Sequence, residues 1–161
     1  MGLSTATCDI LKICKPLLEE NRTAIGVTFY RKLFDENPGL RNTFNMSHQR
    51  PPQGAGDASA QQLSLSNALI AYCANCDQLD KLGPFVERVA NKHVSFNVQP
   101  EQVGTLLHTS HLQYQHYLQY PVVGGVLLAT LEEVLGKETF NEAVKGAVAE
   151  AYFFMADIFI R

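Results

Sequence analysis

His93, which ends an apolar stripe, is the residue whose surroundings in the sequence most clearly suggest a chemical role. Val86 and Val89 precede His93 at helical spacing, so the three side chains are expected on one face of a helix. A neutral imidazole is costly to bury unless its ring nitrogens find hydrogen bonds or a metal ion. His93 is therefore a candidate metal ligand, although a helical histidine is more often an ordinary core or surface residue.

Other residue types capable of chemistry form weaker patterns. Cys73 and Cys76 make a CxxC motif without a second pair, so buried or surface thiols are favoured over a redox or zinc site. His108 and His111 share a helical face, but no cysteine or carboxylate within residues 103–119 completes a metal site. The glycine pair at 124–125 follows no strand, so no dinucleotide-binding fingerprint applies.

The elements that position these residues are expected to be helices. Helical periodicity runs through most of the chain, Ser4 is placed to cap the first helix, and residues 37–39 end the second. Residues 48–59, rich in proline and glycine, form a loop. We find no strand pattern and no repeat, so the prediction is an all-α single domain. The expected helices cover about 5–18, 21–36, 60–76, 81–92, 122–135 and 140 onward.

Composition narrows the class of protein. A chain of 161 residues with a net charge of −3 suits one soluble domain and gives no sign of binding nucleic acid or an anionic membrane surface. No apolar run reaches the length of a membrane span, and no secretory leader is recognisable. Four cysteines are too few for a disulfide scaffold, so free thiols and a cytoplasmic location are expected.

Short runs of residues, all in one order along the chain, resemble a known family. They lie at 29–34, 37–38, 44–50, 67–72, 92–102, 120–124 and 127–131. Any one run alone would be weak, but the combination is specific and covers most of the chain. It resembles the globin domain of flavohaemoglobins and of the related single-domain bacterial-type haemoglobins.

The resemblance implies a globin fold around a b-type haem, with no site for FAD or NAD in this chain. By the same resemblance, His93 matches the proximal iron ligand, Tyr30 the distal tyrosine and Gln61 the distal glutamine. Each position has an ordinary packing interpretation when taken singly, but together they favour the haem interpretation. The remaining residues expected at the haem are Leu65, Phe44, Phe29, Val98 and Tyr120.

Side-chain chemistry agrees with a distal role for Tyr30 and Gln61, because both can donate hydrogen bonds to a bound ligand. Dioxygen bound to ferrous haem gains negative charge, and a hydrogen bond to a charged acceptor contributes about 1.5–3 kcal/mol. That range corresponds to roughly one to two orders of magnitude in oxygen affinity. Slow oxygen release suits reaction chemistry better than delivery.

The sequence departs from the family pattern in three places. The loop around 51–59 is longer than usual, which leaves Gln53 and Gln62 as neighbours of Gln61, although the gap-free match that follows favours Gln61. Residues 103–119 look inserted, and an unspliced intron would explain them. The chain stops at Arg161. The last helix of the domain at 1–161 is therefore expected to be truncated before the glutamate that, with Tyr120, would support the proximal histidine.

These observations predict an oxygen-binding globin that supports nitric oxide detoxification by dioxygenation to nitrate. Its expected partners are dioxygen, nitric oxide and an electron-donating reductase, which is either external to this chain or missing from a truncated flavohaemoglobin. Oxygen storage or delivery without catalysis is the alternative. A haem-based gas sensor is the weakest interpretation, because no transmitter segment is recognisable.

Overall fold

The described part of the protein is built from helices. The computed structural model describes residues 2–43, 58–78, 83–84, 87 and 108–160. No strand occurs among these residues, which confirms the predicted all-α class. The elements are α1 (Thr5–Glu20), α2 (Arg22–Glu36), the 3-10 helix η1 (Pro38–Thr43), α3 (Ala60–Ala74), α5 (His108–Leu135) and α6 (Glu142–Ile160).

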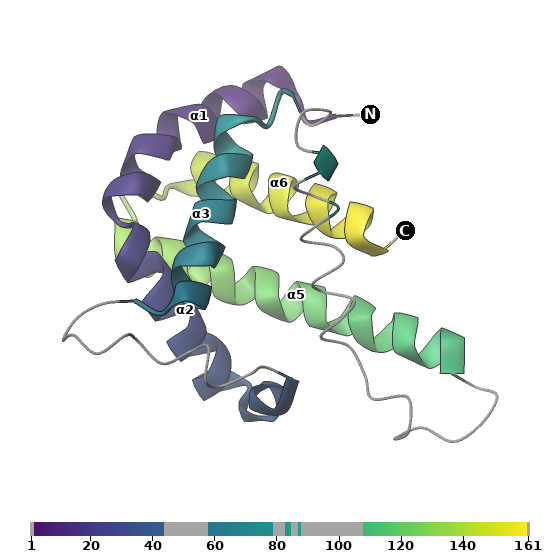
Figure 1. Ribbon diagram of the computed structural model, residues 1–161. Coiled ribbons are helices and arrows are strands. Elements are labelled where there is room, and N and C mark those ends of the chain that lie inside the picture. The colour runs from purple at the N-terminus through teal and green to yellow at the C-terminus, as the bar shows by residue number, and fades with distance from the viewer. Residues whose placement is uncertain (1, 44–57, 79–82, 85–86, 88–107, 161) are drawn as a thin grey trace.

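The helices pack across one another around a shared core. Helix α1 packs on α3 and α6, while α2 packs on α3 and α5, and α5 and α6 lie side by side (Figure 1). Leu11 of α1, Leu33 of α2 and Leu131 of α5 are each 1% exposed, so the core lies where these helices meet. Helix α3 therefore contacts both N-terminal helices.

Helix α1 begins as the sequence predicts. The Ser4 hydroxyl accepts a hydrogen bond from the backbone N–H of Thr7, which satisfies one of the free donors at the helix start. The apolar positions Leu11, Cys14 and Leu18 recur at helical spacing and are buried. Burial of this one face is what fixes α1 against its neighbours.

The start of α3 is fixed by a reciprocal cap. The Gln62 backbone N–H donates to the Ser59 hydroxyl at 3.2 Å, and the Ser59 backbone N–H donates to the Gln62 side chain at 2.8 Å. This capping box gives a hydrogen-bond partner to two backbone N–H groups that would otherwise have none at the helix start. The Ser59 N–H needs such a partner because Ser59 is fully buried. It places the helix start at Ala60, as predicted.

A glycine lets α2 and α3 approach closely. A Cβ atom added to Gly26 would lie 2.4 Å from the backbone oxygen of Gln62, so a larger residue would force the helices apart. At the same crossing, the Ser66 hydroxyl donates to the carbonyl oxygen of Arg22 at 2.7 Å. The first half of α3 is therefore held directly against α2.

Helix α5 begins earlier than the sequence interpretation expected. It starts at His108 and runs without a break into the predicted segment 122–135. Residues 108–119 contain neither glycine nor proline, so nothing in their composition interrupts the helix. The proposed insert at 103–119 is thus helical from His108 onward, and whether it is an insert stays a prediction.

Some expectations fall where the structure gives no description. The loop at 48–59 is described only at residues 58–59, and the helix expected at 81–92 only at residues 83–84 and 87. Within the described helices, none combines the length and apolar character needed to cross a membrane.

Candidate functional site

Tyr30 lies in the second half of α2 with its ring enclosed by aromatic neighbours. The residue is 7% exposed. Its ring meets that of Phe29 edge to face, with centroids 5.1 Å apart, and lies 5.9 Å from the Phe34 ring. These contacts limit the rotation of the tyrosine side chain, so the position of its hydroxyl is set by packing.

The hydroxyl of Tyr30 is a neutral hydrogen-bond donor over the physiological range. Burial raises the pKa of Tyr30 to about 12, because the phenolate would lose its hydration. A hydrogen bond with the Gln61 side chain acts in the opposite direction on this pKa. That direction is the one expected when the amide of Gln61 donates to the phenolic oxygen.

Gln61 is the second residue of α3 and is half-buried. The structure therefore brings together two residues that are far apart in sequence and were predicted to act together. It also separates Gln61 from one alternative, because the side chain of Gln62 is engaged in the cap with Ser59. The other alternative, Gln53, lies outside the described residues.

Apolar side chains accompany this polar pair. Phe29 is 3% exposed and belongs to the core, while Leu65 is half-buried and packs against that core. Leu65 follows Gln61 by one helical turn, so both project from the same side of α3. The described site thus combines two neutral donors with apolar neighbours, which suits a small polar ligand in a low-dielectric setting.

Comparison with known proteins decides the family. The Globin family model matches residues 27–158. This chain is a globin. The match includes both Tyr30 and Gln61 and extends through nearly all of α6.

Relatives and solved structures agree with that assignment. The chain is 37% identical to a flavohemoprotein of Oceanobacillus iheyensis over 158 residues, or 98% of this chain. It is 38% identical to a flavohemoprotein of Vibrio cholerae over 94% of this chain. The globin spans about one third of the length of these curated relatives, 33% and 32% respectively.

Two bacterial structures have the same fold. A globin from Campylobacter jejuni aligns with a TM-score of 0.72 at 27% identity, covering 98% of this chain and 94% of the other. An engineered carbene transferase, described as a candidate nitric oxide dioxygenase of Rhodothermus marinus, aligns with a TM-score of 0.74 at 26% identity. That alignment covers 98% of this chain and 90% of the other.

The globin family implies haem, and the described residues fit the ligand side of such a group. Tyr30 supplies a buried, protonated donor, and Phe29 and Leu65 supply apolar surface. The iron ligand predicted on the opposite side, His93, lies outside the described residues, as do Phe44 and Val98. Tyr120 lies within α5, but its side chain is not described.

The described residues of the globin show no second metal site away from the proposed haem. No group of three or more histidine, cysteine, aspartate or glutamate side chains could hold a metal ion among these residues. The side chains of His108 and His111 are not among those described. Their pairing therefore stays a hypothesis.

Two positioning features of the site were missed from the sequence. The Ser59 and Gln62 capping box has a readable signature, serine followed three residues later by glutamine. The hydrogen bond from Ser66 to the carbonyl of Arg22 has no such signature, because it depends on how α2 and α3 cross. The cap could have been found from the sequence, whereas the Ser66 contact required the fold.

Proposed function

We propose that this globin binds a b-type haem through His93 and converts nitric oxide and dioxygen to nitrate. The observation that carries the proposal is the buried contact between Tyr30 and Gln61. Support comes from the flavohemoprotein relatives and from the structural neighbour described as a candidate nitric oxide dioxygenase. When bound, haem would supply the iron at which gases bind and electrons are exchanged.

Each member of the polar pair carries a side-chain group that is able to donate a hydrogen bond to a ligand. In the proposed function, the hydroxyl of Tyr30 donates to the ligand and the Gln61 amide donates to the phenolic oxygen. A ligand that gains negative charge accepts such a bond more strongly than a neutral one. Gln61 thus orients Tyr30, and Tyr30 orients and polarises the ligand.

Apolar packing increases the strength of that hydrogen bond. Phe29 and Phe34 flank the tyrosine ring, and Leu65 packs against the same core. Tyr30 is only 7% exposed, so its hydroxyl has little contact with water and does not exchange freely between ligand and solvent. We infer slow ligand dissociation, which favours a reaction on the bound ligand.

Conversion of nitric oxide and dioxygen to nitrate consumes one electron in each turnover, so an electron donor is required. We propose an electron-donating reductase as the partner of this globin. A cytoplasmic location would suit such a partner. Oxygen storage or delivery is the alternative, and it would need the same tight binding without the electron supply.

The test compares two buried tyrosines in the haem-loaded protein. Tyr30→Phe removes the proposed donor and should speed oxygen dissociation by about tenfold or more, measured by stopped flow. Tyr72→Phe is the matched control, because the Tyr72 hydroxyl is also buried but donates to the carbonyl oxygen of Ala151 at 3.1 Å. An off-rate unchanged in Tyr30→Phe, or raised equally in Tyr72→Phe, would remove Tyr30 from the proposed role.

A second measurement separates catalysis from storage. With a reductase and its reductant added, the wild-type protein should form nitrate from nitric oxide and dioxygen, and Tyr30→Phe should form it more slowly. Slow oxygen release without nitrate formation would favour storage. His93→Ala should lose stable haem, and a normal visible spectrum in that variant would overturn the ligand assignment.

A further inference from the structure

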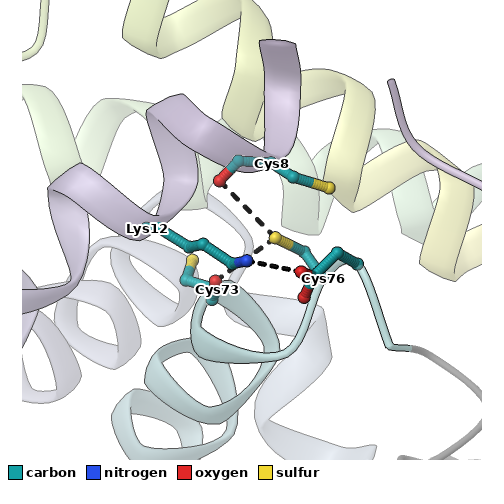
Figure 2. A network of polar contacts seen from close by, with 5 residues as sticks. Cys8, Lys12, Cys73 and Cys76 are labelled. Carbon is teal, nitrogen blue, oxygen red and sulfur yellow. Dashed lines mark hydrogen bonds and ion pairs between the residues drawn. The ribbon is translucent and has the colours of Figure 1, made fainter. Parts of the chain in front are cut away.

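Three buried cysteines meet where α1 passes the end of α3. Cys8 lies near the start of α1, Cys73 lies in the last turns of α3, and Cys76 follows directly after the C-cap residue Asn75 (Figure 2). Their exposed fractions are 3%, 1% and 2% respectively. All three are free thiols.

The side chain of Cys76 reaches across to α1. Its sulfur lies 3.7 Å from the carbonyl oxygen of Cys8 and 3.3 Å from that of Cys73 (Figure 2). After burial, the side chain of Cys8 is the next cause that raises the pKa of Cys76, as a hydrogen-bonding neighbour. Since the Cys76 sulfur already lies against the backbone of Cys8, we expect side-chain rotation to bring the two sulfur atoms to bonding distance.

We propose that Cys8 and Cys76 are a reversible dithiol–disulfide pair that links α1 to the end of α3 when a two-electron oxidant is present. Hydrogen peroxide is one such oxidant. Attack of one thiolate on a peroxide oxygen gives a sulfenic acid and releases water after proton transfer. The second sulfur then attacks the sulfenic sulfur, the S–S bond forms, the S–OH bond breaks and a second water leaves. Two thiols lose two protons and two electrons, and the peroxide takes them up to become two waters.

Cys73 is the competing partner, since it forms the CxxC motif with Cys76. The contact between these two residues runs from the Cys76 thiol to the backbone carbonyl of Cys73. The side-chain hydrogen bonding that acts on the pKa of Cys76 comes from Cys8 instead, and the Cys76 sulfur lies 3.7 Å from the Cys8 carbonyl oxygen. The geometry therefore favours a bond between helices over a bond within the CxxC motif.

Charged neighbours influence how readily Cys8 and Cys76 react with an oxidant. Lys12 of α1 lies beside the thiols (Figure 2). It forms an ion pair with Asp77. The positive charge of Lys12 favours the thiolate of Cys76, but burial outweighs it and raises the pKa of Cys76 to about 12. The reactive thiolate is scarce near neutral pH, so the pair is expected to oxidise slowly and to act as a lock on the fold rather than a fast sensor.

A disulfide between Cys8 and Cys76 would enclose most of α1 and all of α2 and α3, including Tyr30 and Gln61. Closing so long a loop restricts the unfolded chain and stabilises the folded one. The oxidised protein should therefore melt about 5–10 °C higher than the reduced protein.

The experiment treats the full haem-loaded chain with diamide, which accepts two hydrogens from a pair of thiols without the peroxide chemistry of haem. Peptide mapping by mass spectrometry under non-reducing conditions should find Cys8 joined to Cys76, with a mass loss of two hydrogens that dithiothreitol reverses. Cys14→Ser is the matched control, because Cys14 is another buried thiol of α1 and should leave the bond intact. Cys8→Ala and Cys76→Ala should each prevent both the bond and the rise in melting temperature.

Three outcomes would overturn the proposal. These are a dominant bond between Cys73 and Cys76, bonds only between separate molecules, or four free thiols after exhaustive treatment. The wild-type peptide map decides among them even if an alanine variant fails to fold. None of these outcomes depends on whether the globin turns over nitric oxide.

Discussion

Tyr30 is the proposed hydrogen-bond donor of the site because three properties coincide in this residue. It is buried, its ring is wedged between Phe29 and Phe34, and its oxygen meets the side chain of Gln61. Burial alone would make a hydroxyl costly, and the Gln61 contact offsets part of that cost. The arrangement keeps the tyrosine neutral, which is what a hydrogen-bond donor requires.

The raised pKa of Tyr30 gives a prediction for stability at alkaline pH. The folded protein holds this proton up to a pKa of about 12, whereas an ordinary tyrosine in the unfolded chain releases it near 10. Stability is therefore unaffected below the unfolded pKa and is lost as the pH rises toward the folded pKa. The difference in unfolding free energy between wild type and Tyr30→Phe should fall by roughly 1 kcal/mol between about pH 9 and about pH 11.

Urea unfolding at each pH, followed by circular dichroism, measures this difference. Working with the difference cancels the contributions of other alkaline groups, including Tyr72, whose pKa is also raised by burial. A difference that stays constant over this range would mean that Tyr30 titrates normally and is not enclosed as described.

At the scale of helices, the site depends on how α2 and α3 cross. Gly26 lies one turn before Tyr30 on α2, and the backbone of Gln62 follows Gln61 on α3. The close approach at Gly26 therefore sets the separation of the two functional side chains. The capping box at Ser59 completes the arrangement, because it fixes which residue begins α3.

Gly26→Ala tests this crossing. The added Cβ would lie 2.4 Å from the Gln62 backbone oxygen, so α3 must shift, and we expect a loss of about 1–3 kcal/mol in stability. The same shift should loosen the Tyr30 contact and raise the oxygen off-rate.

Gly146→Ala is the control, because Gly146 is exposed on α6 and a Cβ there meets nothing within 4 Å. This variant should stabilise the protein by about 0.5–1 kcal/mol and should not change the oxygen off-rate. If Gly26→Ala changed neither the stability nor the oxygen off-rate, the close approach of α2 and α3 at Gly26 would be contradicted.

The sequence predicted those elements whose signals are local. The Ser4 cap, the start of α3 at Ala60 and the end of α2 before Pro38 are all confirmed, because each depends on a few neighbouring residues. The pairing of Tyr30 with Gln61 was predicted from family resemblance and not from local pattern. The helical continuation of α5 back to His108 was missed because its apolar face is weakly marked. The roles of His93, Phe44, Val98 and Tyr120 stay predictions.

At the scale of the whole molecule, α1 joins the two ends of the described chain. Its buried face packs on α3 and α6, and its Thr7 hydroxyl donates to the carboxylate of Glu150 at 2.6 Å. Helix α1 precedes the residues matched by the Globin family model, which begin at residue 27. It contributes to stability from a position remote from Tyr30, so stability and ligand binding should be separable.

Thr7→Val tests that separation. The variant keeps the shape of the side chain but removes the donor to Glu150, and Thr7 itself is 6% exposed. We expect a loss of about 1–2 kcal/mol in urea unfolding, since a charged acceptor loses its partner but can still reach water. The oxygen off-rate should match that of wild type.

Thr23→Val, at an exposed position on α2, is the control and should change stability by less than about 0.5 kcal/mol. A raised off-rate in Thr7→Val, together with a normal value in Thr23→Val, would show that α1 is coupled to the site through α3. In that event, locking α1 to the end of α3 through Cys8 and Cys76 should lower the off-rate in the oxidised protein. The two sets of measurements would then describe one coupling between the N-terminal helix and the bound ligand.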